Sequence, residues 1–401
     1  MTDGSPVAAA TSAETSARSA GRSLRAVRRT VAGPALRTWL ASRALVLVLA
    51  VAVSPLLARQ GRELHPAPWP FDRLAGWDTW HFTRIAERGY LPPGLPCCDQ
   101  AFFPGYPALI RLVMPFTAGS ALAAGVLVTL AAGAVAAVLL YRLALQLSGD
   151  ERTARAAVLY LSVAPFGVFL TAVYSEALFL ALSLGAWLAS VRRRWWLAGA
   201  VAAGASLVRV NGLFLAVALG VLYLGQLWAD GERRPRADVL ALGLPVLATG
   251  GYFAYLTART GSLTAWQDAQ VAGWDRHGAW PWQGLLAGWR HVQEPASLHL
   301  QVSRWADLLT VVAGLVLVLV LARLRRWAEG VYVGLNVAVL VCSTTLVSAP
   351  RYTLTWFPAY LLIAELVQRP GWRWLRGPLP IASAVAMTVL TVWFATHRWV
   401  A

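Results

Sequence analysis

Residues able to do acid–base chemistry gather in one short segment of the sequence, Trp77–Arg88. Asp78 and His81 are three residues apart there, so they share one face if the segment is helical. Arg84 and Arg88 add guanidinium groups. Such a carboxylate could deprotonate a hydroxyl while the cations hold an anionic phosphate. The alternative is a solvated interfacial helix with ordinary ion pairs.

A second group of polar residues surrounds Glu176. With Ser175 as N-cap and Glu176 in the first turn, the start of a helix and its dipole would be satisfied, which is a complete structural explanation. The functional alternative is that these residues hydrogen-bond to a substrate hydroxyl. The residue types leave both interpretations open.

Two arginines lie at turns near the ends of apolar runs: Arg209, followed by Asn211, and Arg351, followed by Tyr352. An arginine inside a membrane costs about 2.5–3.5 kcal/mol at the helix centre and less near the interface, so it usually has a partner. Snorkelling to the lipid headgroups is one explanation. Bidentate binding of a phosphate at the membrane boundary is the other.

A later loop is rich in side chains that stack on sugars or bind their hydroxyls. Tryptophan rings stack on sugar faces, yet they are also typical of a membrane interface belt, so this signal is weak alone. The set consists of Trp266, Gln267, Asp268, Gln270, Trp274, Asp275, Trp280, Trp282 and Trp289.

The elements that must position these groups are membrane helices. Of 401 residues, 58% are hydrophobic and only 13% charged, which a soluble core cannot accommodate. Apolar runs long enough to cross a bilayer recur along the chain, so we predict an all-α integral membrane protein with about eleven transmembrane helices. They cover residues 37–57, 119–147, 154–171, 174–191, 196–209, 212–228, 239–257, 305–322, 331–348, 353–368 and 379–396.

Basic residues set the predicted orientation. The net charge is +16, all 35 basic residues are arginine, and they cluster in short connections between apolar runs, which indicates topology rather than nucleic-acid binding. With the arginine-rich residues 1–36 as a disordered cytosolic tail, every cluster falls on the cytoplasmic side. The clusters are Arg152 with Arg155, Arg192–Arg194, Arg233–Arg236, Arg323–Arg326 and Arg369–Arg376.

This orientation leaves two long loops outside, residues 58–119 and 258–304, and an outer C-terminus at 397–401. The first loop is expected to carry two short interfacial helices, Trp77–Arg88 closed by Gly89, and Pro107–Met114. The polytopic domain therefore spans residues 37–396 and has room for an active site only on its extracytoplasmic face.

Several chemistries are excluded by what the sequence lacks. It has no DxD metal motif, no glycine-rich phosphate loop and no HExxH motif, so we expect no metal and no cofactor. Cys97 and Cys98 are adjacent and lack metal-site spacing, so a vicinal disulfide and free thiols both stay open. Without a nucleotide-binding domain, an activated substrate for an outer active site would have to arrive dissolved in the bilayer, and a polyprenyl-phosphate sugar fits that requirement.

Taken together, the motifs resemble the PIG-V family of mannosyltransferases, within the C-type membrane glycosyltransferases. The arginine-only, alanine-rich composition favours a bacterial member. The resemblance rests on short motifs in a common order: Gly76-Trp77-Asp78 with His81-Phe82, Phe102-Phe103-Pro104 with Tyr106-Pro107, Thr171 to Glu176, Arg209 with Asn211-Gly212, and Pro350-Arg351-Tyr352.

This resemblance implies transfer of mannose from a β-linked polyprenyl-phosphate donor with inversion. The acceptor is a hydroxyl of a lipid-linked, glycan or protein molecule. Asp78 would be the catalytic base, although Asp72 or Asp99 could take that place. His81, Arg209 and Arg351 would lie at the donor phosphate, and Glu176, Asn211 and Tyr352 would complete substrate binding.

A transporter or flippase of a lipid-linked sugar is the alternative from another class. Alternating access needs polar groups along a path open to both faces. The polar clusters here crowd one face, and Asp307, Asn336 and Glu365 are the candidates inside spans.

Overall fold

The structure, a computed structural model of the 401-residue chain, describes residues 33–52, 71–91 and 98–401. Most of the predicted tail and parts of the first outer loop lie outside these residues. Within the described part, every regular element is helical, and an isolated bridge joins Gly278 to Ser343.

Helices follow one another along the chain with short connections. Besides a first helix at Gly33–Ala52 and several 3₁₀ turns, the α-helices are α2 (Asp78–Arg88), α3 (Gly105–Val113), α4 (Ala121–Ser148), α5 (Glu151–Ser162), α6 (Glu176–Val191), α7 (Trp195–Val208), α8 (Asn211–Ala229), α9 (Leu244–Thr260), α10 (Ala265–Trp274), α11 (Pro281–Gln293), α12 (Leu298–Arg323), α13 (Trp327–Val341), α14 (Pro350–Thr353), α15 (Phe357–Leu366) and α16 (Pro378–Ala395).

Six helical segments in the described part are long and apolar enough to cross a membrane. They are Gly33–Ala52, α4, α8, Ala237–Thr260 including α9, α12, and Pro370–Ala395 including α16. Four shorter apolar helices, α6, α7, α13 and α15, lie among them. The prediction of a multi-pass helical membrane protein is thus confirmed, with six full-length candidates where the sequence suggested about eleven.

Two predicted spans are wrong in their extent. The segment 154–171 is not one helix, because α5 ends at Ser162 and a separate 3₁₀ turn forms at Gly167–Leu170. Pro165 lies between them, and it lacks an N–H and obstructs the preceding turn. The segment 331–348 is helical only to Val341, since the following residues pair with the loop after α10: the Ala279 N–H donates to the Cys342 carbonyl at 2.9 Å.

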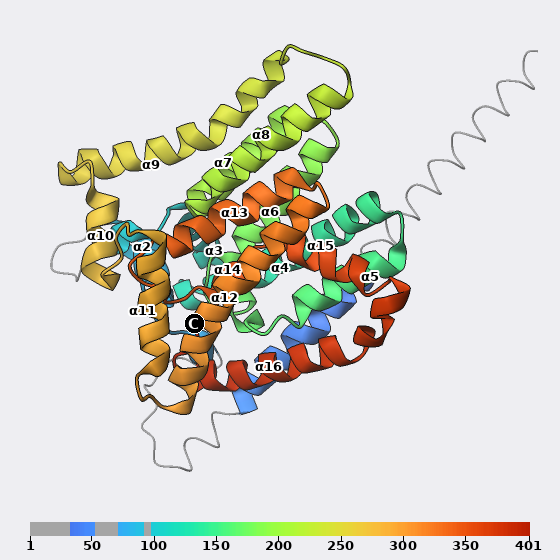
Figure 1. Cartoon of the computed structure of the whole chain (residues 1–401). Coiled ribbons are helices and arrows are strands. Elements are labelled where there is room, and N and C mark those ends of the chain that lie inside the picture. Colours follow the sequence, from blue (N-terminus) through green and yellow to red (C-terminus); the bar gives the residue numbers. More distant parts are fainter. Residues whose placement is uncertain (1–32, 53–70, 92–97) are drawn as a thin grey trace, which may run out of the picture.

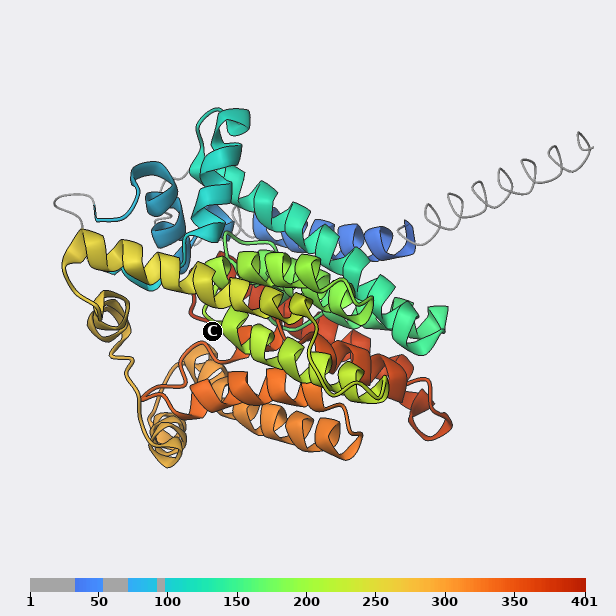
Figure 2. The same cartoon turned by 90° about the horizontal axis from the view of Figure 1, so that it is seen from above.

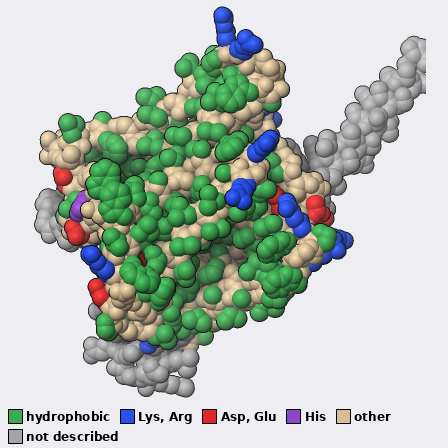
Figure 3. Space-filling view, viewed as in Figure 1, with side chains coloured by type: hydrophobic (Ala, Val, Ile, Leu, Met, Phe, Trp, Pro, Cys, Tyr) green, Lys and Arg blue, Asp and Glu red, His purple; other side chains and the backbone are tan. Residues whose placement is uncertain are grey.

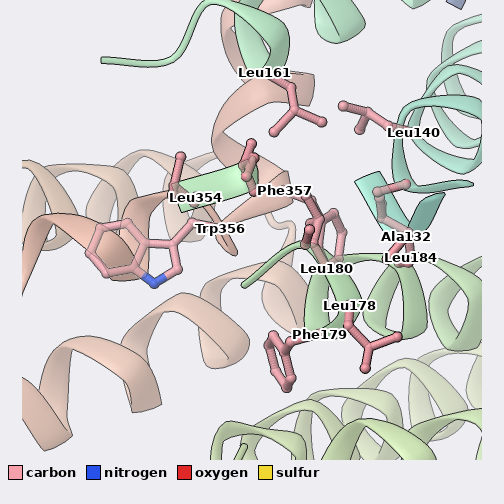
Figure 4. Packing of buried hydrophobic residues seen from close by; sticks show 14 of the residues in the cluster. Ala132, Leu140, Leu161, Leu178, Phe179, Leu180, Leu184, Leu354, Trp356 and Phe357 are labelled. Carbon is pink, nitrogen blue, oxygen red and sulfur yellow. The ribbon is translucent and has the colours of Figure 1, made fainter. Parts of the chain in front are cut away.

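The long helices pack closely because small residues lie at their contacts. A Cβ atom added to Gly199 of α7 would lie 2.1 Å from the Ala241 carbonyl oxygen. Glycine at such a contact lets two helix backbones approach, as is typical of membrane bundles. Elsewhere larger side chains fill the space, and Figure 4 shows Leu140, Leu161, Leu180 and Phe357 gathered from α4, α5, α6 and α15.

The two ends of the bundle differ in character. Figures 1 and 2 show long helices running side by side, with α10 and α11 at one end. Connections rich in arginine meet at the other end, where Arg193 pairs with Asp230 and Arg326 pairs with Glu365. On the face in Figure 3, apolar side chains cover the middle and most arginines lie away from α10 and α11. This division separates the arginine clusters from the polar groups described next.

Candidate active site

A cavity of about 400 Å³ opens among the helix ends opposite the arginine clusters. It is bounded by α2, by the connections before α6, α8 and α14, and by the segment 266–278 of the later loop. Its lining includes Asp78, Ser175, Arg209, Asn211, Trp266, Gln267, Gln270, Trp274, Arg276, Ser343, Arg351 and Tyr352. Five of the seven site residues expected from the sequence therefore line one cavity.

Arg351 joins the two carboxylates of the site. Its Nη1 donates to Asp78 Oδ2 at 2.6 Å, and its Nε donates to Glu176 Oε1 at 2.8 Å. Its guanidinium also lies 4.6 Å from the Tyr174 ring centroid, in a cation–π contact. Only 8% of the Arg351 side chain is exposed, so both ion pairs are shielded from solvent screening.

Glu176 is fully buried behind the cavity wall and binds a second arginine. Arg209 Nη1 donates to Glu176 Oε1 at 2.9 Å and to Ser175 Oγ at 3.0 Å. The expectation that Ser175 caps α6 through its side chain is wrong, because its hydroxyl accepts from Arg209 and makes no capping bond. Glu176, in the first turn of α6, thus binds an arginine that is distant in sequence rather than stabilising its own helix end.

The backbone before Asp78 is held in an uncommon conformation. Trp77 has φ of +48°, which is rare for a bulky residue and persists only when its surroundings enforce it. Its ring lies 5.1 Å from that of Phe394 and 5.4 Å from that of Trp399. The Tyr174 hydroxyl also donates to the Gly76 carbonyl at 3.0 Å. These contacts fix the start of α2 and hence the direction of Asp78.

The backbone before Arg351 is held in a similar way. Ser348 has φ of +70°, and the next amide, Ala349 N–H, donates to Asp307 Oδ1 at 3.0 Å. Asp307 is buried on α12, so this helix anchors the short helix α14 that carries Arg351.

Asn211 and Tyr352 also contact their neighbours at the cavity. Asn211 Nδ2 donates to Asn336 Oδ1 at 2.7 Å, which ties the start of α8 to α13. The Tyr352 ring lies under the Arg209 guanidinium at 5.6 Å from its centroid. Both residues line the same cavity as Arg209 and Arg351.

His81 lies outside the cavity lining and contacts Asp99 rather than Asp78. Its Nδ1 is 2.7 Å from Asp99 Oδ1, and Arg84 Nε donates to Asp99 Oδ2 at 2.8 Å. Burial opposes ionisation of Asp99, yet the hydrogen bonds from Arg84 and His81 hold the pKa of this carboxyl below its usual range. Asp99 is thus bound to Arg84 and His81, whereas Asp78 lines the cavity and pairs with Arg351.

The tryptophan-rich loop divides between two locations. Trp266, Gln267, Gln270 and Trp274 line the cavity. Trp280 and Trp282 stack on each other with ring planes 4° apart and are 65% and 57% exposed. The first set could contact a sugar, while the second has the exposure expected of an interface belt.

Arg276 and Ser343 also line the cavity, although none of the sequence motifs contains them. Their segments are far apart in sequence and meet through the bridge between Gly278 and Ser343. The sequence does offer one indication for Arg276. It lies in the predicted outer loop, whereas the arginine clusters that orient the helices lie in the predicted cytoplasmic connections.

The described residues contain no group of three or more His, Cys, Asp or Glu side chains able to hold a metal ion. Cys98 is disulfide-bonded and Cys342 is a free thiol, while Cys97 lies outside the described residues.

Part of this chain is similar to known mannosyltransferases. Residues 67–238 match the family model described as Mannosyltransferase (PIG-V). GPI alpha-1,6-mannosyltransferase 2 of Mus musculus is 37% identical over 162 residues, covering 38% of this chain and 31% of the relative. The Homo sapiens protein of that name is 36% identical over 163 residues, with the same two coverages.

The chain thus spans about a third of the length of the curated relatives that it matches. Among solved structures, an oligosaccharyltransferase from Archaeoglobus fulgidus aligns with 90% of this chain and 53% of its own, at a TM-score of 0.47 and 13% identity. The segment matched by the family model contains Asp78, His81, Glu176, Arg209 and Asn211. Over residues 67–238, this chain is similar to the PIG-V mannosyltransferase family.

Proposed function

We propose that the protein is a glycosyltransferase that moves mannose from a polyprenyl-phosphate donor to a hydroxyl of a lipid-linked, glycan or protein acceptor. The observation that carries this proposal is the placement of Asp78 at the cavity, paired with Arg351, which is itself held by the buried Glu176. The similarity of residues 67–238 to the PIG-V mannosyltransferase model supports the same reaction class.

Asp78 is the proposed general base. It would take the proton from the acceptor hydroxyl as that oxygen attacks the anomeric carbon of mannose. The bond from this carbon to the phosphate oxygen breaks on the opposite side, and the polyprenyl phosphate leaves with both bonding electrons. Asp78 is the acidic side chain among the described residues of the lining, which supports one direct displacement with inversion over a route through a second carboxylate nucleophile.

The surrounding residues would orient the substrates and stabilise developing charge. Arg351 and Arg209 lie near the leaving phosphate, where fixed cations favour charge separation in a shielded cavity. Asn211 and Tyr352 contact the donor or acceptor, and Glu176 holds both arginines in place. A direct phosphate contact by His81 remains a prediction.

The extracytoplasmic location belongs to this proposal as well. The cavity and the arginine clusters lie at opposite ends of α6, whose first residue is Glu176 and whose last turn leads into Arg192–Arg194. Arginine-rich connections favour the cytoplasmic side, so the cavity would face outward in a cell membrane.

A transporter receives less support from the polar groups inside the bundle. Asp307 accepts an amide hydrogen bond, Asn336 bonds to Asn211, and Glu365 pairs with Arg326. Each of these three groups already has a partner within the protein. They therefore do not supply the open polar path that alternating access needs.

The test is transfer from radiolabelled polyprenyl-phosphate mannose in membranes that contain the wild type, Asp78→Asn or Asp150→Asn. Asp150 caps α5 at the arginine-rich end of the bundle, outside the cavity lining, and Asn caps a helix equally well, so it is a matched acidic control. We expect Asp78→Asn to lose about 100-fold or more of the transfer rate, as typical general-base catalysis contributes, with Asp150→Asn near the wild type. Equal transfer by Asp78→Asn at normal expression would exclude Asp78 as the base. Separating labelled lipid, glycan and protein identifies the acceptor class, and His81→Ala in the same assay tests the histidine.

A further inference from the structure

We propose that Arg276 and Ser343, which line the same cavity as Arg209 and Arg351, bind the phosphate of the lipid-linked donor directly. The inference rests on the proposed function and adds two residues that neither the motifs nor the family match contains. Both lie outside residues 67–238.

The first argument is charge balance at the cavity. Two of the lining arginines, Arg209 and Arg351, are matched by two carboxylates, Glu176 and Asp78. Arg276 is a third lining arginine, and it has no ion pair within the described part of the chain. The two carboxylates balance the charges of Arg209 and Arg351, and the charge of Arg276 is left over. An excess positive charge in a cavity favours an anionic ligand.

The second argument is that the same wall holds polar atoms without partners. Arg276 Nε and Ser343 Oγ are both buried, and neither has a hydrogen-bond partner in the described structure. Leaving such atoms unpaired is costly, so their persistence at a cavity indicates a ligand that pairs with them. A guanidinium N–H and a hydroxyl both donate to phosphate oxygens.

These two residues are held together by backbone contacts. The bridge between Gly278 and Ser343 and the bond from Thr344 N–H to the His277 carbonyl, at 3.1 Å, join their segments. Arg276 Nη2 donates to the Val347 carbonyl at 2.7 Å, which fixes the guanidinium, while Nε has no hydrogen-bond partner in the described structure. The subsite is thus preorganised rather than formed by mobile surface side chains.

The wall beside the subsite can accept a lipid chain. Val339 and Leu340, on the last turn of α13, line the cavity together with Val347. Val339 is 41% exposed, so the apolar wall reaches the surface of the bundle. A cation and a hydroxyl beside an apolar exit match a phosphate attached to a hydrocarbon chain, which distinguishes this ligand from free phosphate.

Asp307 is the acid that could instead neutralise Arg276. It interacts with Arg276 electrostatically, but its Oδ1 accepts the Ala349 amide and it forms no ion pair with Arg276 within the described residues. Asp307 therefore holds α14 in place and leaves the guanidinium open to a ligand.

The test is binding to the purified full chain in detergent, followed by tryptophan fluorescence, since Trp274 lines the cavity. The probes are polyprenyl phosphate, the neutral polyprenol, phosphatidylinositol and inorganic phosphate. We expect Arg276→Met to weaken polyprenyl phosphate binding about tenfold or more and to leave polyprenol binding unchanged. Arg276→Lys should recover part of the affinity, because a lysine keeps the charge without the planar donor pair.

Ser343→Ala gives a second, milder variant, with an expected loss of about threefold to tenfold for one hydrogen bond. Arg290→Met is the control, since Arg290 is exposed on α11 outside the lining, and it should bind as the wild type does. Melting temperatures confirm that each variant is folded.

The outcomes separate this subsite from the proposed reaction. Unchanged polyprenyl phosphate affinity in folded Arg276→Met and Ser343→Ala, with mannose transfer intact in the wild type, overturns the subsite alone. Loss of affinity for phosphatidylinositol or inorganic phosphate, without loss for polyprenyl phosphate, also overturns it and assigns the arginine to another phosphate. A wild type that neither binds polyprenyl phosphate nor transfers mannose overturns the donor class itself.

Discussion

At the scale of single residues, the site depends on one arginine between two carboxylates. Arg351 bonds to Asp78 and to Glu176, and Glu176 is fully buried. A buried ion pair adds little stability compared with apolar residues, but removing one partner leaves an unpaired charge. Glu176 therefore matters less as a contact with substrate than as the group that keeps both arginines in place.

We predict that Glu176→Gln lowers the free energy of unfolding by about 3 kcal/mol, because Arg209 and Arg351 lose their buried counter-charge. Glu151→Gln is the matched control, since Glu151 pairs with Arg155 four residues away with 52% of its side chain exposed. That change should leave the free energy of unfolding close to that of the wild type, because solvent screens an exposed ion pair. Thermal unfolding in detergent measures both, and an equal effect of the two substitutions would contradict the structural role of Glu176.

At the scale of elements, interruptions between helices bring the polar groups to the cavity. The break after α5 leads through Gly167–Leu170 to Glu176, and it leaves carbonyl groups that no helix satisfies. Arg43, buried on the first helix, donates to the Ser162 carbonyl at 2.6 Å and also to the Gly167 carbonyl. A distant helix thus stabilises the turn that presents Glu176.

We predict that Arg43→Met loosens this turn, because both carbonyls lose their donor, at about 1–3 kcal/mol for each unsatisfied group. Amide hydrogen exchange of residues 163–174 should then be faster by about tenfold or more. Arg37→Met, on the exposed side of the same helix, should leave that exchange unchanged. Unchanged exchange in Arg43→Met as well would show that Pro165 and packing alone hold the turn.

At the scale of the whole molecule, the fold places the arginine-rich connections at one end of the bundle and the candidate active site at the other. Salt bridges among the arginine-rich connections, such as Arg193 with Asp230, lie at one end, and the cavity lies at the other. This separation matches a membrane enzyme whose substrates arrive from the lipid phase on one side.

We predict that an epitope inserted after Arg234, between α8 and α9, is reached by antibody only in permeabilised cells. An epitope inserted after Arg290, on α11, should be reached in intact cells, because the positive-inside rule places the arginine clusters in the cytoplasm. Immunofluorescence with and without detergent measures both. The reverse pattern would place the cavity in the cytoplasm and remove the argument for an outward-facing active site.

The sequence by itself determined the class of the molecule, because hydropathy, helix caps and charge bias act over a few neighbouring residues. It predicted a helical membrane protein, the helix α2 closed by Gly89, and Asp78, Glu176, Arg209 and Arg351 as groups of interest. It also predicted the short helix α3, which begins two residues before the expected Pro107.

The tertiary structure alone decided which of these groups meet. Arg351 and Asp78 are 273 positions apart, and Arg351 and Glu176 are 175 apart, so no local pattern records their contacts. The same holds for His81, which shares a helix face with Asp78 yet pairs with Asp99, and for Arg276, which reaches the cavity only through pairing with the segment after α13. Local propensity forms the helices, but their packing selects the partners of each buried charge.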